Sequence, residues 1–375
     1  MRVHLLKLLV KPLKVYILRR VVYIFGVLFV LFACDHTNSY KVSGRLSNLI
    51  DMTLYVVYES SEKFVIDTVV CNEKGKFSVF YGQDDDLQAI TVYYNDREQW
   101  FTLYPEIGEP VRVKGDARYP LLLDIRGGRV NDKLSEFKKK AKPILKELSD
   151  LQVNMPVHGE EAVQRTNLNL EMRKSIQDFV AKNPKEKASA ALISEYYTKP
   201  DEIEIKENLL NLLSPELDDY ILVKNIRKEI EKAKTISVGA KAPNFNVTNV
   251  YGQTFTIDSL ANKSYILVFT AAWCDMCQPE ALTLDEITTK YAKDSLEIML
   301  ISLDDKPDEI RERALQDSIQ WNITADSVGQ SIRLFDLYNV QTIPKCFLID
   351  KNGIIRLNTR NGEELKHYVD EIMKY

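Results

Sequence analysis

Between residues 40 and 128, short apolar runs alternate with polar, turn-forming segments. The runs are rich in β-branched and aromatic residues, which is typical of β-strands. They predict strands over 40–44, 53–58, 64–70, 77–81, 89–94 and 111–113. We therefore expect residues 34–128 to form a small all-β domain, either an antiparallel sandwich or a barrel.

Residues 129–236 show a helical pattern instead. Apolar residues recur there at steps of three and four, which places them on one face of a helix. These residues are Leu134, Phe137, Ala141, Ile144 and Leu148. Pro143 is expected to kink this helix, because proline lacks the backbone N–H that a helix needs. Further helices are predicted over 166–182, 186–198, 203–213 and 215–235. Ser214 is the expected N-cap of the last helix, and the whole region is predicted to form a helical domain.

Residues 237–375 alternate strands with helices. The runs 265–270 and 297–302 are continuously apolar, as buried strands are, and each is followed by a helical pattern. Two further strands, 346–350 and 354–356, flank a turn at Asn352-Gly353. A helix over 363–374 closes this region. The order is strand–helix–strand followed by strand–strand–helix, which predicts an α/β domain.

The first 33 residues have the pattern of a signal peptide. Six lysines and arginines and no acid precede residue 21. Residues 21–33 then form a run of 13 apolar or small residues, which is too short for the about 20 residues of a membrane-spanning helix. We therefore predict that residues 1–33 direct export of the chain.

The end of this segment resembles a bacterial lipobox, in which a cysteine takes a diacylglycerol and becomes the new N-terminus. Leu31, Ala33 and Cys34 carry the resemblance, whereas Phe32 replaces the usual small residue. An uncleaved signal anchor is the alternative. Both interpretations take the chain out of the cytoplasm and into a compartment in which disulfides persist. We expect a membrane-anchored lipoprotein, acylated at Cys34 and facing the periplasm.

Charge and cysteine content narrow the possible functions. The net charge is −4, and without the six cations of the signal segment it is −10. An acidic chain with no long basic run is not expected to bind nucleic acid. Five cysteines are too few for a disulfide-stapled scaffold. Cys71 lies in a β pattern and Cys346 in a predicted buried strand, and both are expected to be inert core thiols.

Trp273-Cys274-Asp275-Met276-Cys277 is the segment with the clearest chemistry. It follows a predicted buried strand and opens a helix, whose N-terminus stabilises a thiolate. The spacing lets the second sulfur reach the first and resolve a mixed disulfide. Cys274 is therefore the expected nucleophile and Cys277 the resolving thiol. No metal is predicted, because zinc needs four ligands and no second cysteine pair exists.

Four residues besides the cysteines complete the candidate site. Ile343-Pro344 directly precedes the predicted strand 346–350. Glu280 lies three residues after Cys277, about one helical turn further on, and is the candidate acceptor for the proton of Cys277. Trp273 is expected to pack beside the helix and shield the disulfide.

These residues together resemble the TlpA/ResA-like branch of the thioredoxins, grouped with the broad AhpC/TSA superfamily. The matching segments are 238–245, 273–280, 343–344 and 347–353. The resemblance covers about 140 residues and implies a thioredoxin fold over 237–375. It implies a cis peptide bond before Pro344, in a loop that faces the disulfide and docks the substrate backbone together with Ile343 and Trp273. The buried aspartate of thioredoxin falls at Val268, so Glu280 would have to substitute for it.

The resemblance also implies a function and its partners. The expected activity is that of a membrane-tethered thiol–disulfide oxidoreductase with exported proteins as substrates and a membrane electron donor or acceptor as partner. The redox-active disulfide is the reacting group and no other cofactor is predicted. Ile343 before the proline matches thioredoxin itself and favours a reductant. The segment 66–78 resembles an uncharacterised β domain that precedes thioredoxin domains in lipoproteins of Gram-negative bacteria.

Several alternatives stay open at this point. Met276 departs from the proline that the family usually has, and Asp275 adds a negative charge beside the nucleophile. The pair is also compatible with a structural disulfide or with a non-catalytic binding lipoprotein built on a thioredoxin scaffold. A thiol peroxidase is disfavoured because Ala271 and Leu267 stand where it needs Thr or Ser and Pro. A copper chaperone of related fold would need a different cysteine spacing.

Overall fold

The computed structural model describes most of the chain after residue 38. The described residues are 39–59, 64–82, 89–153, 159–199, 202–260, 262–291, 295–316, 319, 321–326 and 329–374. The predicted signal peptide and Cys34 lie outside them and stay predictions. No helix among the described residues has the length and apolar character needed to span a membrane.

The chain divides into two compact units. The first comprises Met1–Tyr196 with Leu212–Leu222, and the second comprises Tyr197–Asn211 with Val223–Tyr375. The helices of residues 129–236 are therefore shared between two units, where the sequence predicted one helical domain. Each unit is described by itself.

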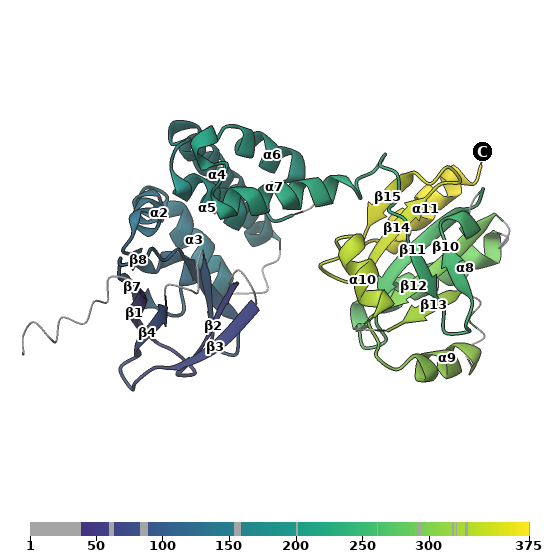
Figure 1. Cartoon of the computed structure of the whole chain (residues 1–375), viewed down its shortest axis with the longest axis horizontal. Helices are drawn as coiled ribbons and strands as arrows, with labels where there is room; N and C mark the ends of the chain where they lie inside the picture. Colours follow the sequence, from purple (N-terminus) through teal and green to yellow (C-terminus); the bar gives the residue numbers. More distant parts are fainter. Residues whose placement is uncertain are drawn as a thin grey trace, which may run out of the picture. The chain divides into compact units, whose positions relative to one another are not determined.

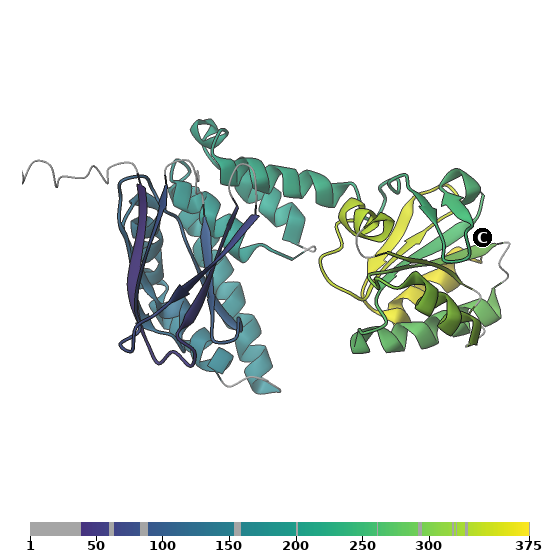
Figure 2. The ribbon, with the colours of Figure 1, turned by 60° about the horizontal axis from the view of Figure 1, so that its bottom comes forward.

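The described residues of the first unit form eight strands in two four-stranded sheets, and Figures 1 and 2 show these sheets from two directions. The strands are β1 (Ser39–Ser47), β2 (Thr53–Glu59), β3 (Phe64–Val70), β4 (Lys76–Gly82), β5 (Ile90–Tyr94), β6 (Gln99–Leu103), β7 (Val111–Asp116) and β8 (Asp124–Arg126). One sheet has the order β4-β1-β7-β8 and the other β3-β2-β5-β6. The predicted all-β region is confirmed. Two short strands, β6 and β8, were not predicted, and β1 pairs with β7 in parallel rather than antiparallel.

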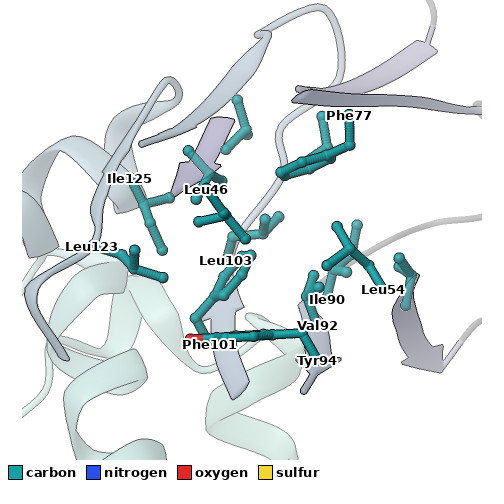
Figure 3. Packing of buried hydrophobic residues seen from close by; sticks show 14 of the residues in the cluster. Leu46, Leu54, Phe77, Ile90, Val92, Tyr94, Phe101, Leu103, Leu123 and Ile125 are labelled. Carbon is teal, nitrogen blue, oxygen red and sulfur yellow. The ribbon is translucent and has the colours of Figure 1, made fainter. Parts of the chain in front are cut away.

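A single apolar core between the two sheets makes this region a sandwich. In β1, Tyr40, Val42 and Leu46 are buried, whereas the alternate residues Lys41 and Arg45 are exposed. Side chains of successive strand residues point to opposite faces, so this alternation aims one face of each sheet at the other. Side chains from both sheets meet in the core (Figure 3).

The predicted helical region is confirmed, with changed helix boundaries. The helices are α2 (Arg129–Lys140), α3 (Lys142–Val153), α4 (Glu160–Lys182), α5 (Lys187–Tyr196), α6 (Ile203–Asn211) and α7 (Ile221–Lys234). Pro143 separates α2 from α3 instead of kinking one helix, since proline is tolerated in the first turn of a helix. Ser214 caps only a short 3-10 turn, where it accepts the Glu216 N–H, and α7 begins at Ile221.

Polar contacts show why α6 and most of α7 belong to the second unit. The almost fully buried Lys206 of α6 forms an ion pair with Glu229 of α7, with 2.7 Å between Nζ and Oε2. Further along α7, Lys232 forms an ion pair with Asp336 at 2.5 Å. The amide of Asn358 donates to the Ile236 carbonyl just after α7. These contacts bind the two helices to each other and to the C-terminal region.

The second unit has a central five-stranded sheet of order β13-β12-β11-β14-β15 (Figure 1). Its strands are β11 (Ser264–Thr270), β12 (Leu296–Ser302), β13 (Asn322–Ala325), β14 (Lys345–Ile349) and β15 (Ile355–Thr359), preceded by a hairpin of β9 (Asn246–Thr248) and β10 (Thr254–Thr256). Its later helices are α8 (Gln278–Lys290), α9 (Pro307–Gln316), α10 (Gln330–Leu337) and α11 (Gly362–Ile372). β11 to β13 are parallel, whereas β14 and β15 are antiparallel to their neighbours. The predicted thioredoxin-like fold is confirmed.

Alternate residues of β11 explain why helices cover both faces of this sheet. Ile266 and Val268 belong to an apolar cluster that includes residues of α8 and α11. Tyr265, Leu267 and Phe269 face the opposite way, into a cluster that includes residues of α10. A strand buried on both faces is expected to be continuously apolar, as this one is.

Candidate active site

The candidate site begins where β11 ends. After Thr270 the chain enters a tight loop and then a 3-10 turn, Asp275–Cys277, that leads into α8. The Cys274 N–H donates to the Ala271 carbonyl at 3.1 Å, and the Cys277 N–H donates to the Cys274 carbonyl at 3.0 Å. These two bonds fold the segment so that both cysteines lie at the start of the helix.

Cys274 and Cys277 are joined by a disulfide. Their Cα atoms are 5.4 Å apart, which is within the usual range for a disulfide. The two residues are 8% and 7% exposed, so little of either reaches solvent. A partner must therefore approach closely along this edge of the sheet to reach a sulfur.

The disulfide lies in a small apolar cluster that brings distant segments together. Ala271 is buried beside the two cysteines, and Leu303 and Ile343 pack against them. Ile343 is about 70 residues further along the chain than Cys274. The peptide bond between Ile343 and Pro344 is cis. The structure thus places Ile343, a predicted docking residue, against the disulfide.

Two large apolar side chains next to the disulfide face solvent. Trp273 is 67% exposed and Met276 is 71% exposed. They lie next to Cys274 and Cys277 in the sequence, so apolar surface is available beside the buried sulfurs. The exposure of Trp273 differs from the packed position that the sequence suggested.

Asp304 belongs to the site, although the sequence analysis did not single it out. Its carboxylate accepts the Ala272 N–H, with 2.9 Å between N and Oδ2, and also accepts the Ser302 hydroxyl. Thr270 and Ser302 are directly paired at the ends of the parallel strands β11 and β12. Because parallel strands end at the same edge, an acid just after the second strand was the signal that points to this contact.

Arg360 is a second residue that sequence reasoning missed. Its guanidinium donates to the carbonyl oxygens of Ile343 at 3.4 Å and Pro344 at 3.3 Å. Lys345 directly follows Pro344 in the chain. Its burial and the positive charge of Arg360 both lower the pKa of Lys345. In β14 and β15, Cys346 pairs with Thr359, so counting outward from the turn would have placed residue 360 beside this loop.

The other sequence-predicted residues are placed as follows. The backbone of Glu280 lies in the first turn of α8, but its side chain is outside the described part of the structure. Its role stays a prediction.

Val268, at the position of the buried aspartate of thioredoxin, is 2% exposed and lies directly opposite Cys346, which is fully buried. Burial raises the pKa of the Cys71 thiol in the first unit to about 11, which suppresses its thiolate.

In the described part of the chain, no group of three or more His, Cys, Asp or Glu side chains is arranged to hold a metal ion. The chemistry that the arrangement itself offers is thiol–disulfide exchange, which needs two sulfurs within bonding distance and access for a partner.

Comparison with known proteins agrees with this description. The AhpC/TSA family model matches residues 238–358. The thiol-disulfide oxidoreductase ResA of Bacillus thuringiensis subsp. konkukian (strain 97-27) is 28% identical over 143 residues, which cover 38% of this chain and 80% of that protein. The thioredoxin-like protein YneN of Bacillus subtilis (strain 168) is 25% identical over 146 residues, covering 37% of this chain and 83% of that protein.

A solved structure of a thiol-disulfide oxidoreductase from Bacteroides fragilis NCTC 9343 is also similar. It is 25% identical, covers 35% of this chain and 98% of that chain, and has a TM-score of 0.32. On the sequence matches, the C-terminal region of this chain contains an AhpC/TSA domain and is homologous to the ResA-like proteins.

Proposed function

We propose that this chain is a thiol–disulfide oxidoreductase that exchanges disulfides with exported proteins through Cys274 and Cys277. The observation that carries the proposal is the disulfide between these residues, placed between β11 and α8 and packed against Ile343. The homology of the C-terminal region to enzymes of this name supports it. The domain is an enzyme, and its reacting group is the cysteine pair itself.

The proposed reaction starts from the reduced pair. The Cys274 thiolate attacks one sulfur of a substrate disulfide, and the other substrate sulfur leaves as a thiolate that takes up a proton. Cys277 then loses its proton and attacks the sulfur of Cys274, which releases the second substrate thiol. The substrate gains two electrons and Cys274–Cys277 is oxidised to the disulfide. A membrane electron donor restores the dithiol, and the reverse sequence oxidises a substrate.

Cys274 is assigned as the attacking sulfur because it precedes the turn and is nearer to solvent-exposed Trp273 in the chain. The positive end of α8 and the N–H groups of the turn stabilise its thiolate. Cys277 is the resolving sulfur, and Glu280 accepts its proton. Ile343 and Pro344 dock the substrate backbone, with Arg360 holding their carbonyl groups.

The proposed location is the periplasmic side of a membrane, with Cys34 acylated as the tether. An exported enzyme meets its substrates where disulfides form and persist. Within this assignment the protein acts as a reductant, since Ile343 before the proline is the residue that thioredoxin has. Its partners are exported proteins that carry disulfides or thiols and a membrane electron donor.

Trapping of mixed disulfides tests the proposal. Cys277→Ser leaves the attacking sulfur but removes the resolving one, so it should accumulate covalent complexes with exported proteins that reductant dissolves. Cys274→Ser is the matched control and should trap none. The reverse pattern would refute the assignment of the two sulfurs. Absence of complexes from either variant, together with no insulin-disulfide reduction by the unaltered chain, would leave a non-catalytic scaffold.

The redox potential of the Cys274–Cys277 pair determines whether the protein reduces or oxidises its substrates. Equilibration of Cys274–Cys277 with glutathione is expected to give a value near the about −270 mV of thioredoxin. A value near the about −120 mV of a strong oxidant such as DsbA would make the protein an oxidase of exported thiols instead.

A further inference from the structure

One face of the β-sandwich carries cations that lie directly opposite one another. On the outer face of sheet β4-β1-β7-β8, four cations of β1, β4 and β7 are exposed: Arg45, Lys76, Arg112 and Lys114, here named the basic face. In the cross-strand register, Arg45 of β1 lies opposite Lys76 of β4 on one side and Lys114 of β7 on the other. Like charges directly opposite each other destabilise a sheet.

Acidic side chains of the same sheet do not neutralise this row. Asp124 of β8 lies opposite Lys114, but its ion pair is with Arg126, at 2.8 Å. Its second contact is the Ser135 hydroxyl at 3.1 Å. Within the described part of the chain, no ion pair to an acid is seen for the four residues of the basic face. The repulsion is therefore left in the folded protein, and an external anion would relieve it.

The basic face also has the hydroxyl groups that a phosphate needs. The four cations lie among the residues that line a shallow hollow of about 630 Å³, together with Asn72, Val70 and Phe77. Ser43 of β1 and Ser78 of β4 are directly opposite each other and line it. Lysine and arginine form strong charge-assisted hydrogen bonds with phosphate, and hydroxyl groups add further donors. A phosphate-bearing anion is the ligand that fits this chemistry.

The position of the sheet in the chain indicates where that phosphate comes from. β1 begins at Ser39, five residues after Cys34. Five extended residues span at most about 18 Å, so acylation at Cys34 would keep this sheet within reach of lipid headgroups. The chain after the signal segment has a net charge of −10, which an anionic membrane repels. Attraction to such a membrane therefore depends on a local cluster of cations such as this one.

We propose that the basic face binds an anionic phospholipid surface through its phosphate groups. The sandwich then lies against the membrane as a second attachment beside the lipid anchor. A basic patch is a common second contribution to membrane attachment beside a lipid anchor, because it attracts anionic headgroups. The proposal goes beyond the redox function and does not involve the cysteine pair.

Vesicle sedimentation tests this without the lipid anchor. The protein is the chain from Asp35 to Tyr375, which holds every described residue and lacks Cys34. It should bind vesicles that contain phosphatidylglycerol and not vesicles of phosphatidylcholine alone. Raising the salt concentration should release it, because exposed charges are screened.

A double substitution distinguishes binding through the basic face from an effect of the net charge of the whole protein. Arg45→Gln with Lys114→Gln should weaken binding to phosphatidylglycerol vesicles about 25-fold, since one basic residue near an anionic surface contributes about fivefold. The same variant should keep or raise the thermal unfolding temperature, because it removes opposed like charges. The matched control, Lys142→Gln with Lys146→Gln, removes the same charge from exposed positions of α3 in the same unit and should bind as the unaltered chain does.

Equal weakening by both double variants would overturn the proposal, because only net charge would then matter. Release of the protein from vesicles by millimolar inorganic phosphate would also overturn it, since the face would then be a site for a small phosphate. Insulin-disulfide reduction should be unchanged in the Arg45 and Lys114 variant. A failure of the proposed redox function is thus distinguishable from a failure of membrane binding.

Discussion

The Ala272 backbone N–H donates a hydrogen bond to the Asp304 carboxylate, with 2.9 Å between N and Oδ2. Ala272 directly precedes the Trp273-Cys274 segment, and Asp304 follows β12. The Ser302 hydroxyl donates to the same carboxylate and fixes its position. The loop that leads to the Cys274–Cys277 disulfide is thereby attached to the neighbouring strand.

Removing this carboxylate should slow disulfide exchange with little loss of stability. Asp304→Ala leaves the Ala272 N–H without its acceptor and frees the loop before Cys274. Loss of one such hydrogen bond costs about 1 kcal/mol, so insulin-disulfide reduction should fall by about fivefold. Asp304→Asn keeps an oxygen acceptor and should retain most of the rate.

The neighbouring residue provides the control for this experiment. Asp305→Ala removes an acid of the same loop that is exposed, and it should leave the rate unchanged. If Asp304→Asn loses as much activity as Asp304→Ala, the negative charge matters and the hydrogen bond does not.

Glu280 should control the release of mixed disulfides through Cys277. Cys277 is 7% exposed, so its proton is costly to pass directly to water. A carboxylate in reach accelerates such a step by about 10²–10⁴-fold. Glu280→Gln keeps the shape and removes the base, so insulin reduction should slow at neutral pH and partly recover at higher pH. An unchanged pH–rate profile would exclude Glu280 from the mechanism.

Cys34 should carry the lipid. The motif Leu31-Phe32-Ala33-Cys34 ends the apolar run of the signal segment. Cells grown with labelled fatty acid should incorporate label into the chain, and Cys34→Ser should abolish it. Cys71→Ser is the control, since that buried thiol should not be acylated. Label that persists in Cys34→Ser would contradict the lipid anchor.

Asp350 should stabilise the second unit in a pH-dependent way. It is 6% exposed, and its carboxylate accepts the Asn352 and Ile354 N–H groups, each at 2.9 Å, and pairs with Arg356. Burial alone would raise its pKa, but these donors outweigh burial and the pKa lies below its usual value. The folded state therefore favours the carboxylate. Its contribution is present above the unfolded-state pKa of about 3.9 and is lost as the pH falls through the lower folded-state pKa.

Asp350→Asn should accordingly lower the free energy of unfolding by about 1–3 kcal/mol at pH 7, and the difference from the unaltered chain should shrink below about pH 4. Urea unfolding followed by tryptophan fluorescence measures this, in a Trp100→Phe background that leaves tryptophans of the second unit only. Asp308→Asn, at a position with 84% of its side chain exposed, is the control and should change little. A difference that does not depend on pH would show that the Asp350 charge contributes nothing.

The sequence by itself determined most of the helices and strands and indicated the cysteine pair. The continuous apolar run of β11 identified a strand buried on both faces, and Cys274 with Cys277 after its end predicted thiol–disulfide exchange. The same holds for the alternation in β1, where Val42 is buried and Lys41 exposed. These signals are local, because side-chain periodicity and the first turn of a helix depend on residues a few positions apart.

Local signals predicted less where a segment is short or where neighbouring structure determines the position at which a helix begins. β8 has three residues and shows no period of its own. The helix expected to begin at Pro215 begins at Ile221, since Ser214 caps only a short 3-10 turn. A capping pattern indicates that a turn starts and does not fix how far it continues.

Only the tertiary structure decided which distant residues surround the disulfide. Ile343 packs against the cysteines, Asp304 holds the loop before them, and Arg360 holds the carbonyl groups of the proline loop. The tertiary structure also placed Arg45 opposite Lys76 and Lys114, which no pattern within one strand can indicate. Strand pairing is selected by the burial of whole sheet faces summed over both partners, so the register that aligns these residues is a property of the assembled sheets and not of any segment of the sequence.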